Sequence, residues 1–345
     1  MSDSQCLQDW VETFLPDSFV VRGDLSILPL NGDAGFRHYF RANTEPSLIA
    51  VSAPPEHENN PGFVSVALLL KQHGIHTPTI FAVDYQQGFL LLEDFGDRLL
   101  LPHLLPDTVD RFYDAAETVL LKIQQIPLTP DLLPDYSRQP LLDEMNLFPE
   151  WFLTQLLGVD LQPSDHDLLN ETMAILVDSA LEQPQVLVHR DFHSRNLMLL
   201  ADEEIGVIDF QDAVTGPLAY DLVSLLRDCY VRWPVDYISQ RALNYYRSAE
   251  AAGIAPQASK AQILRWFDLM GLQRHIKVLG IFSRLCLRDG KHNYLNDLPL
   301  VIRYTLEQLA PYPELGRFKD WFELRVLPQL PQQDWYHPWE TAGDE

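Results

Sequence analysis

The sequence predicts an α+β protein with a small, mainly β N-terminal lobe and a large, mainly α C-terminal lobe. In residues 1–95, short apolar runs alternate with Gly-, Pro- and polar-rich turns, which is typical of strands and hairpins. From Pro106 onward, apolar residues recur at helical spacing, except for short β-like runs between Gln185 and Asp209. We therefore expect a boundary near residue 96, with one lobe over 1–95 and the other over 96–345.

Composition agrees with a globular, cytoplasmic protein. The chain has 345 residues with 46% hydrophobic content, which is enough for two lobes with apolar cores of their own. No apolar run approaches the length of a bilayer span, and the N-terminus lacks the basic start and apolar core of a signal peptide. The three cysteines are widely spaced, which favours reduced thiols over a disulfide frame or a zinc site.

The formal net charge of −24 repels nucleic acid and anionic membrane surfaces, so we expect neither as a partner. The net charge of the whole protein does not indicate the charge of the substrate-binding pocket. A cationic acceptor would suit this charge, and so would a neutral sugar. We expect a monomer, although no motif in the sequence specifies the oligomeric state.

In the N-terminal lobe we expect a helix around Leu7–Phe14 and a β run over Leu25–Leu30, followed by a hairpin whose tip contains Gly32, Asp33 and Gly35. Such a glycine-containing tip can approach phosphate groups through its backbone N–H groups, although an ordinary hairpin tip has the same pattern. Further strands are predicted at residues 48–55, 80–84 and 89–97, and a helix is predicted at residues 62–73. In the C-terminal lobe helices are predicted at residues 108–125, 142–157, 168–181, 218–228, 236–251 and 258–282, and after 298.

We expect the catalytic residues in the stretch His189-Arg-Asp191-Phe-His-Ser-Arg-Asn196 and in Ile208-Asp209-Phe210. The second motif lies at the end of the β run that begins at Ile205. A carboxylate beside an acceptor hydroxyl can take its proton. An amide oxygen and a second carboxylate are hard ligands that suit Mg²⁺. The order Asp, Asn, Asp therefore favours phosphoryl transfer, which works mainly by positioning and by neutralising charge.

Other readings of the same residues remain open at this point. His189, Asp191 and His193 alternate as strand residues do, so they could instead ligate a metal in a hydrolase, but that would leave Asn196 and Asp209 without a role. His193 could also be a satisfied core histidine. Asp209 and Asn196 could each stabilise a turn.

These motifs resemble the aminoglycoside phosphotransferase and choline kinase family of small-molecule kinases. The resemblance implies a bilobal protein-kinase-like fold and the cofactors ATP and Mg²⁺. Asp191 would be the catalytic base, and Asn196 and Asp209 would bind the metal. Arg195 and His193 would be helpers near the γ-phosphate.

The resemblance also assigns residues outside the motif. The hairpin tip would contact phosphates, and the backbone around Glu93 and Phe95 would pair with adenine, although a plain strand end with a turn has the same pattern. Asp221, in Gly216-Pro-Leu-Ala-Tyr-Asp221, would support the catalytic loop from behind. The basic residues Arg274, Lys277, Arg284 and Arg288 would lie near the acceptor site, although a solvated helix face is the ordinary reading of such residues.

The third predicted strand departs from the family pattern. Such kinases usually carry a Lys on this strand and a Glu on the following helix to hold the nucleotide phosphates. Here Val51 and Ser52 occupy the slot, and the predicted helix over 62–73 has no acidic residue. Arg37 or Arg41 could supply the positive charge instead, although a solvated strand Arg is the ordinary interpretation of either residue. The departure leaves open altered nucleotide handling, relocated phosphate contacts or a relative without catalysis.

A finer resemblance links the combination Asn31-Gly-Asp-Ala-Gly-Phe-Arg37, the strand without Lys, Leu92-Glu-Asp-Phe-Gly-Asp97 and Ile208-Asp-Phe-Gln-Asp212 to one subgroup. It is similar to the bacterial N-acetylmuramate/N-acetylglucosamine anomeric kinases. These phosphorylate the C1 hydroxyl of an amino sugar in cell-wall recycling, and Asp212 could bind sugar hydroxyls or cap a turn. The alternatives are an aminoglycoside or choline-like acceptor and a non-catalytic pseudokinase that binds a ligand or partner.

Overall fold

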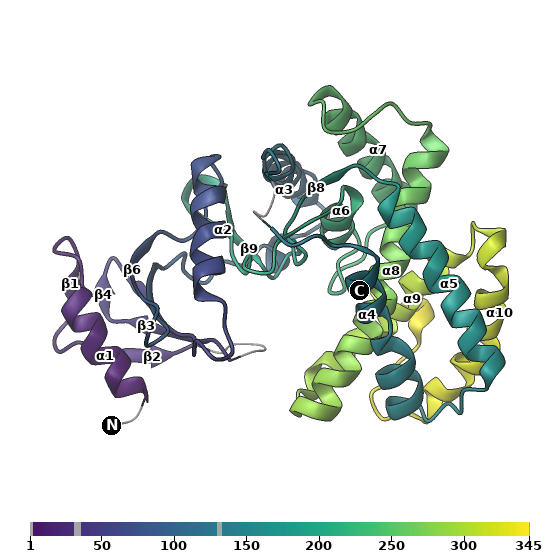
Figure 1. Cartoon of the computed structure of the whole chain (residues 1–345), viewed down its shortest axis with the longest axis horizontal. Coiled ribbons are helices and arrows are strands. Elements are labelled where there is room, and N and C mark those ends of the chain that lie inside the picture. Colours follow the sequence, from purple (N-terminus) through teal and green to yellow (C-terminus); the bar gives the residue numbers. More distant parts are fainter. Residues whose placement is uncertain (1–2, 31–35, 130–132, 345) are drawn as a thin grey trace. The chain divides into compact units, whose positions relative to one another are not determined.

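The computed structural model of the chain describes residues 3–30, 36–129 and 133–344 (Figure 1). The chain forms two compact units. The first comprises Met1–Lys122 and Arg195–Asp212, and the second comprises Ile123–Ser194 and Ala213–Glu345. The first unit contains the whole predicted lobe over 1–95 and adds two later segments. A lobe boundary near residue 96 therefore stays a prediction.

The first unit is built on an antiparallel five-stranded sheet with the strand order β2-β3-β5-β7-β6. Its helices are α1 (Asp3–Phe14), α2 (Asn60–Gln72) and α3 (Val109–Gln124), the last of which ends in the second unit. Its strands are β1 (Val20–Val21), β2 (Ile27–Pro29), β3 (His38–Ala42), β4 (Thr44–Glu45), β5 (Leu48–Ser52), β6 (Ile80–Asp84), β7 (Phe89–Glu93), β9 (Leu197–Leu199) and β10 (Ile205–Val207).

Both faces of the central strand β5 are covered. Alternate residues of β5, Leu48 and Ala50, pack with Leu7 and Val11 of α1 in one apolar cluster. Figure 1 shows α2 on the other side of the sheet from α1. Because successive strand residues point to opposite faces, Leu48 and Ala50 face α1 while Val51 faces the other way. Val51 is therefore enclosed, whereas Ser52 at the end of the strand is half-buried.

The second unit is mainly helical. Its helices are α4 (Arg138–Met145), the π-helix η2 (Phe148–Leu156), α5 (Pro163–Leu181), α6 (Ala219–Leu226), α7 (Val235–Ala251), α8 (Lys260–Asp289), α9 (Leu298–Leu309) and α10 (Gly316–Arg325). Short 3₁₀ turns occur in both units, at Leu101–His103, Ala201–Glu203, His292–Asp297, Pro313–Leu315, Leu327–Gln332 and Trp339–Thr341. Strands β8 (Gln185–Val188) and β11 (Val214–Pro217) form a two-stranded antiparallel sheet.

Helix α8 is the centre of the second unit, and it contacts η2 and helices α4, α5, α6, α7 and α9 (Figure 1). The Ser259 hydroxyl caps its first turn by accepting from the backbone N–H of Gln262 at 3.2 Å. At its end, Gly290 adopts a left-handed φ of 69° and donates its N–H to the Cys286 carbonyl. In the part of the chain that the structure describes, no helix is long and apolar enough to cross a bilayer.

The predicted helix over 142–157 differs from the observed structure. Helix α4 ends at Met145, and a π-helix runs from Phe148 to Leu156. Pro149 has no N–H to continue the α-helical hydrogen bonding. The Phe148 ring stacks on Phe152 with a centroid distance of 5.6 Å, which anchors the new segment in the core.

Helix α8 approaches η2 so closely that Gly280 has no room for a side chain. A Cβ added at Gly280 would lie 2.4 Å from the carbonyl carbon of Leu147 and 2.6 Å from the nitrogen of Phe148. Both are backbone atoms, which cannot rotate away. We expect Gly280→Ala to lower the free energy of unfolding by about 1–3 kcal/mol, the usual cost of overpacking.

Urea unfolding measured by circular dichroism tests this expectation. The matched control is Gly316→Ala at the start of α10, where an added Cβ meets nothing within 4 Å. This control should leave stability unchanged or raise it slightly, because Ala is the better helix former. Equal effects of the two substitutions would contradict the close approach.

Candidate active site

The catalytic loop predicted from sequence begins where strand β8 ends, and a buried carboxylate fixes its backbone. Asp221 in the first turn of α6 is fully buried. Its Oδ2 accepts from the backbone N–H of His189 at 2.6 Å, and its Oδ1 accepts from that of Arg190 at 3.0 Å. Arg190 is held at a left-handed φ of 77°, a conformation that costs energy for a residue with a side chain. The supporting role predicted for Asp221 is therefore present in the hydrogen bonding.

A second buried carboxylate binds the loop three residues beyond Asp191. Asp228 accepts from the backbone N–H of Ser194 at 2.9 Å and also from the Ser194 hydroxyl. Between the two anchors, the N–H of His193 donates to the carbonyl of Asp191 at 2.9 Å. The His193 ring is half-buried and lies edge-on to Tyr230, with centroids 5.6 Å apart. The loop is thus rigid on both sides of Asp191.

Asp191 itself is 41% exposed, and its Oδ1 lies 3.6 Å from Nη2 of the buried Arg274. Burial alone would raise the pKa of Asp191, but the positive charges of Arg274 and Lys277 outweigh it and hold this pKa well below its usual range. Arg274 also donates to the carbonyl of Arg190 at 2.8 Å. Asp191 is consequently a carboxylate that stays ionised and that faces solvent in part, as a base for an incoming hydroxyl requires.

A network of buried charges surrounds this position in the second unit. Lys277 lies 3.0 Å from the Glu144 carboxylate and donates to the Tyr220 hydroxyl at 2.9 Å. Glu144 also pairs with Arg190, and these cations hold the pKa of Glu144 below its usual value against the effect of burial. The family resemblance predicted that Arg274 and Lys277 lie near the acceptor site. No sequence pattern indicated Glu144, which lies in α4, more than 40 residues before the catalytic loop.

In the first unit the two predicted magnesium ligands lie together. The antiparallel strands β9 and β10 pair Leu197 with Val207, which brings the residues that flank them side by side. Asn196 Nδ2 lies 3.2 Å from Asp209 Oδ2, and the N–H of Ile208 donates to the carbonyl of Asn196 at 3.1 Å. Asp209 is exposed and has a left-handed φ of 64°, as is common for strained residues at functional sites.

This pair fits a magnesium ion by its chemistry. Magnesium is usually bound through one or two carboxylates together with substrate phosphates and water. An exposed carboxylate beside an amide group supplies hard oxygen ligands of that kind. Gln211 donates to Asp209 Oδ1 at 2.9 Å and to Asp212 Oδ2 at 3.4 Å, so it orients the first carboxylate and links the second to it. Arg195 is half-buried in the same unit.

The alternative metal site of His189, Asp191 and His193 finds no support. Among the described residues, no group of three or more His, Cys, Asp or Glu side chains is arranged to hold a metal ion. His189 is buried, and its ring lies edge-on to Phe192 at 5.8 Å.

Of the predicted phosphate-binding hairpin, Gly32, Asp33 and Gly35 lie outside the described residues. Arg37, which leads into β3, is buried, and its Nη2 lies 3.0 Å from Oε2 of Glu58. Arg41 on the same strand forms four hydrogen bonds with the carboxylates of Asp94 and Asp97, at 2.6–3.1 Å. Sequence reasoning missed Glu58 because it precedes helix α2 instead of lying within it.

The predicted adenine-contacting segment follows the end of β7. The Glu93 carboxylate accepts from the backbone N–H of Thr79 at 3.0 Å, so its side chain is engaged within the fold. The half-buried ring of Phe95 packs on Gly206, where an added Cβ would lie 2.8 Å from the ring. Gly206 therefore leaves the space that Phe95 occupies. The adenine contact itself stays a prediction.

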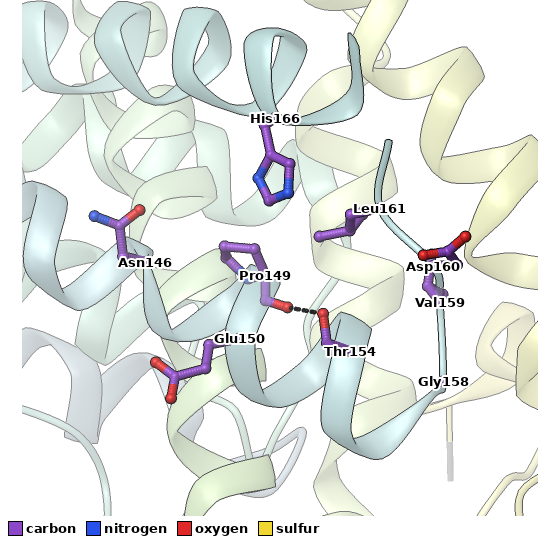
Figure 2. Close-up of a pocket in the computed structure, with 9 residues that line it drawn as sticks. All are labelled: Asn146, Pro149, Glu150, Thr154, Gly158, Val159, Asp160, Leu161 and His166. Atoms are coloured by element: carbon purple, nitrogen blue, oxygen red, sulfur yellow. Dashed lines mark hydrogen bonds between the residues drawn. The ribbon is translucent and has the colours of Figure 1, made fainter. Parts of the chain in front are cut away.

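A separate pocket of about 610 Å³ opens beside η2 in the second unit (Figure 2). Its walls come from the end of α4, from η2 and from the chain that leads into α5, with the His166 ring opposite Pro149. Thr154 closes one side by donating to the Pro149 carbonyl at 2.8 Å. None of the residues predicted from sequence lines this pocket.

The fold and these motifs define a class of enzyme. The chain belongs to the phosphotransferase enzyme family, whose model matches residues 26–256. It is 41% identical over 341 residues to an N-acetylmuramate/N-acetylglucosamine kinase of Pseudomonas aeruginosa, a match that covers 96% of this chain and 99% of the relative. A second N-acetylmuramate/N-acetylglucosamine kinase, from Neisseria meningitidis, is 36% identical over 316 residues and covers 90% of this chain and 92% of the relative.

Solved structures confirm the protein-kinase-like fold predicted from sequence. An ethanolamine kinase of Plasmodium vivax superposes with a TM-score of 0.60 at 14% identity, covering 92% of this chain and 96% of that one. An aminoglycoside phosphotransferase bound to ADP superposes with a TM-score of 0.54 at 12% identity, covering 89% and 99%.

The anchoring by Asp221 predicts a specific effect on turnover. Asn in its place can accept only one of the two N–H bonds, and its own NH₂ would face the other N–H. We expect Asp221→Asn to lower kcat about ten- to a hundredfold, the usual effect of losing a buried hydrogen bond to a charged group. Since burial raises the pKa of Asp221 to about 7, protonation at lower pH should also weaken the loop. The acid-side decline of kcat near pH 7 should then disappear in the variant.

Steady-state kinetics across pH 5–9 measure both effects. The matched control is Asp236→Asn, which changes an exposed carboxylate in the first turn of the neighbouring helix α7. A wild-type kcat in Asp221→Asn would contradict the anchoring role.

Proposed function

We propose that this chain is a Mg·ATP-dependent kinase that phosphorylates the C1 hydroxyl of N-acetylmuramate and N-acetylglucosamine in cell-wall recycling. The observation that carries the proposal is the ionised Asp191 on a loop fixed by Asp221 and Asp228. An anomeric hydroxyl is more acidic than an ordinary alcohol, so a single carboxylate is sufficient to assist its deprotonation. Relatives that match nearly the whole chain carry this substrate pair in their names.

In this proposal Asp191 accepts the proton of the sugar C1 hydroxyl as the hydroxyl oxygen attacks the γ-phosphorus of ATP. The bond from the γ-phosphorus to the bridging β-phosphate oxygen breaks, and ADP leaves. Asn196 and Asp209 would hold the magnesium ion, which when bound neutralises charge on the phosphates. His193 and Arg195 would assist near the γ-phosphate, and the backbone around Glu93 and Phe95 would bind adenine. Asp212 would hydrogen-bond sugar hydroxyls. ATP is available in the cytoplasm, where we expect the enzyme to act.

The charges around Asp191 are closely balanced. Arg190, Arg274 and Lys277 carry three positive charges, and the carboxylates of Asp191, Glu144, Asp221 and Asp228 oppose them. We therefore base the proposed acceptor on the relatives that match nearly the whole chain, whose names carry the two N-acetyl sugars.

The experiment is incubation of the purified protein with Mg·ATP and N-acetylmuramate, N-acetylglucosamine, glucose, choline or an aminoglycoside, followed by phosphorus NMR. We expect a C1 phosphate signal with the two N-acetyl sugars. Transfer only to the amine-bearing acceptors would retain the catalytic assignment and refute the acceptor. Bound ATP without transfer to any acceptor would support the pseudokinase alternative.

Removing the proposed base should lower turnover strongly without affecting nucleotide binding. We expect Asp191→Asn to lower kcat by about 10²–10⁴-fold, the contribution of a positioned general base. The affinity for ADP, measured by calorimetry, should stay within about twofold because the base contacts the acceptor. Asp167→Asn, an exposed carboxylate of α5, is the control. Undiminished kcat in Asp191→Asn would refute the assignment of the base.

A further inference from the structure

The missing Lys of strand β5 leaves the first unit in need of another cation for the nucleotide phosphates. The two arginines of the first hairpin differ sharply in their surroundings. Arg41 is bound on both sides by the carboxylates of Asp94 and Asp97. Its charge is therefore compensated within the fold, and its guanidinium donors are occupied.

Arg37 faces a single carboxylate and keeps unused donors. Its side chain is only 7% exposed, and that of its partner Glu58 is 18% exposed. Nη2 lies 3.0 Å from Glu58 Oε2, but neither Nε nor Nη2 forms a well-directed hydrogen bond to any described residue. A buried guanidinium with unsatisfied donors is costly unless a ligand completes its hydrogen bonding. Phosphate oxygens match a guanidinium in charge and in geometry.

Aromatic stacking connects Arg37 to the segment that carries the predicted magnesium ligand. The guanidinium lies over the Phe63 ring of α2, 4.8 Å from its centroid. Phe63 in turn stacks on Phe210 at 5.0 Å, and Phe210 is the residue after Asp209. Burial raises the pKa of Tyr39, the charge of Arg37 and its hydrogen bond with Tyr39 lower it, and the charge of Asp209 raises it. The charges of Arg37 and Asp209 therefore both act on the Tyr39 side chain.

Glu58 is placed firmly enough to orient Arg37. Asn59 caps helix α2 by accepting from the N–H of Gly62 at 3.0 Å. Asn60, the first residue of the helix, is buried and donates to the carbonyl of Ala53 beyond the end of β5 at 2.8 Å. Glu58 therefore precedes a helix start that is tied to the central strand.

We propose that the Arg37–Glu58 ion pair binds the nucleotide phosphates in place of the strand Lys and helix Glu, with Arg37 contacting phosphate oxygens and Glu58 acting as its positioning residue. This inference rests on the proposed use of ATP. It explains how a chain without the strand Lys can hold a nucleotide.

The test compares the binding of ADP and of adenosine, because only ADP carries phosphates. Calorimetry should show that Arg37→Met weakens ADP binding about ten- to a hundredfold, the value of charge-assisted contacts. Adenosine binding should stay within about twofold, and Arg37→Lys should retain part of the ADP affinity. Glu58→Gln should weaken ADP binding to a smaller extent, because it only orients Arg37. The control is Arg22→Met, which breaks the exposed pair of Arg22 and Glu45 in the same unit.

A folding defect is separated from a binding defect by the double variant. Arg37→Met alone leaves Glu58 without its counter-charge, whereas Arg37→Met/Glu58→Gln removes both charges of the pair. The double variant should bind ADP no more weakly than Arg37→Met, because the two residues act as a unit.

Wild-type ADP affinity in Arg37→Met, or an equal loss of ADP and adenosine binding, would overturn the proposal. These measurements involve no sugar. If ADP binding depends on Arg37 but no C1 phosphate forms, the phosphate-binding pair stands and the proposed acceptor fails. If the wild type binds neither ADP nor ATP, both proposals fail.

Discussion

The catalytic geometry depends on the two hydrogen bonds from the backbone of His189 and Arg190 to the buried carboxylate of Asp221. Without these acceptors, two N–H groups beside a left-handed residue would be buried without partners, at a cost of about 1–3 kcal/mol each. The Asp221 carboxylate offsets the energetic cost of the strained backbone at Arg190. The turn leaves the Asp191 side chain partly exposed to solvent. An Asp in the first turn of α6 is also favoured by the helix dipole, so one residue meets a local and a tertiary requirement.

The second constraint is that the buried charges around Asp191 must compensate one another. The overall composition gives no indication of this local balance. A chain with a net charge of −24 concentrates Arg190, Arg274 and Lys277 around the carboxylate of Asp191, the proposed base. These cations keep Asp191 ionised in spite of its partial burial. Glu144 then limits their mutual repulsion. The net charge of the whole protein therefore says little about the electrostatics of the site.

The sequence indicated residues whose types recur at fixed spacing. The catalytic and metal-binding roles of Asp191, Asn196 and Asp209 were predicted from their order and stay predictions, although the structure places Asn196 beside Asp209. The supporting role of Asp221 was implied by the family resemblance, and its hydrogen bonds to the loop are present. The partners Glu144 and Glu58 were not predictable, because their roles arise from tertiary contacts that no local pattern encodes. The split of the helix over 142–157 could have been anticipated from Pro149, whereas the π-helical form of the second segment depends on aromatic packing. The assignment of Gly32, Asp33 and Gly35 stays a prediction.

With the proposed role of the Arg37–Glu58 pair, a kinase of this family can lack the strand Lys and still bind the nucleotide phosphates. A charged side chain at Val51 would be buried among apolar neighbours, whereas Ser52 at the end of β5 is half-buried. Arg37 of the preceding hairpin is also buried, but its guanidinium lies over the Phe63 ring and is paired with Glu58. Phosphate binding requires a positive charge at a place in space. Any strand, helix or loop that reaches the phosphates can supply the positive charge. The residue that carries the charge can therefore change its position in the sequence, provided that its side chain keeps the same place in the fold.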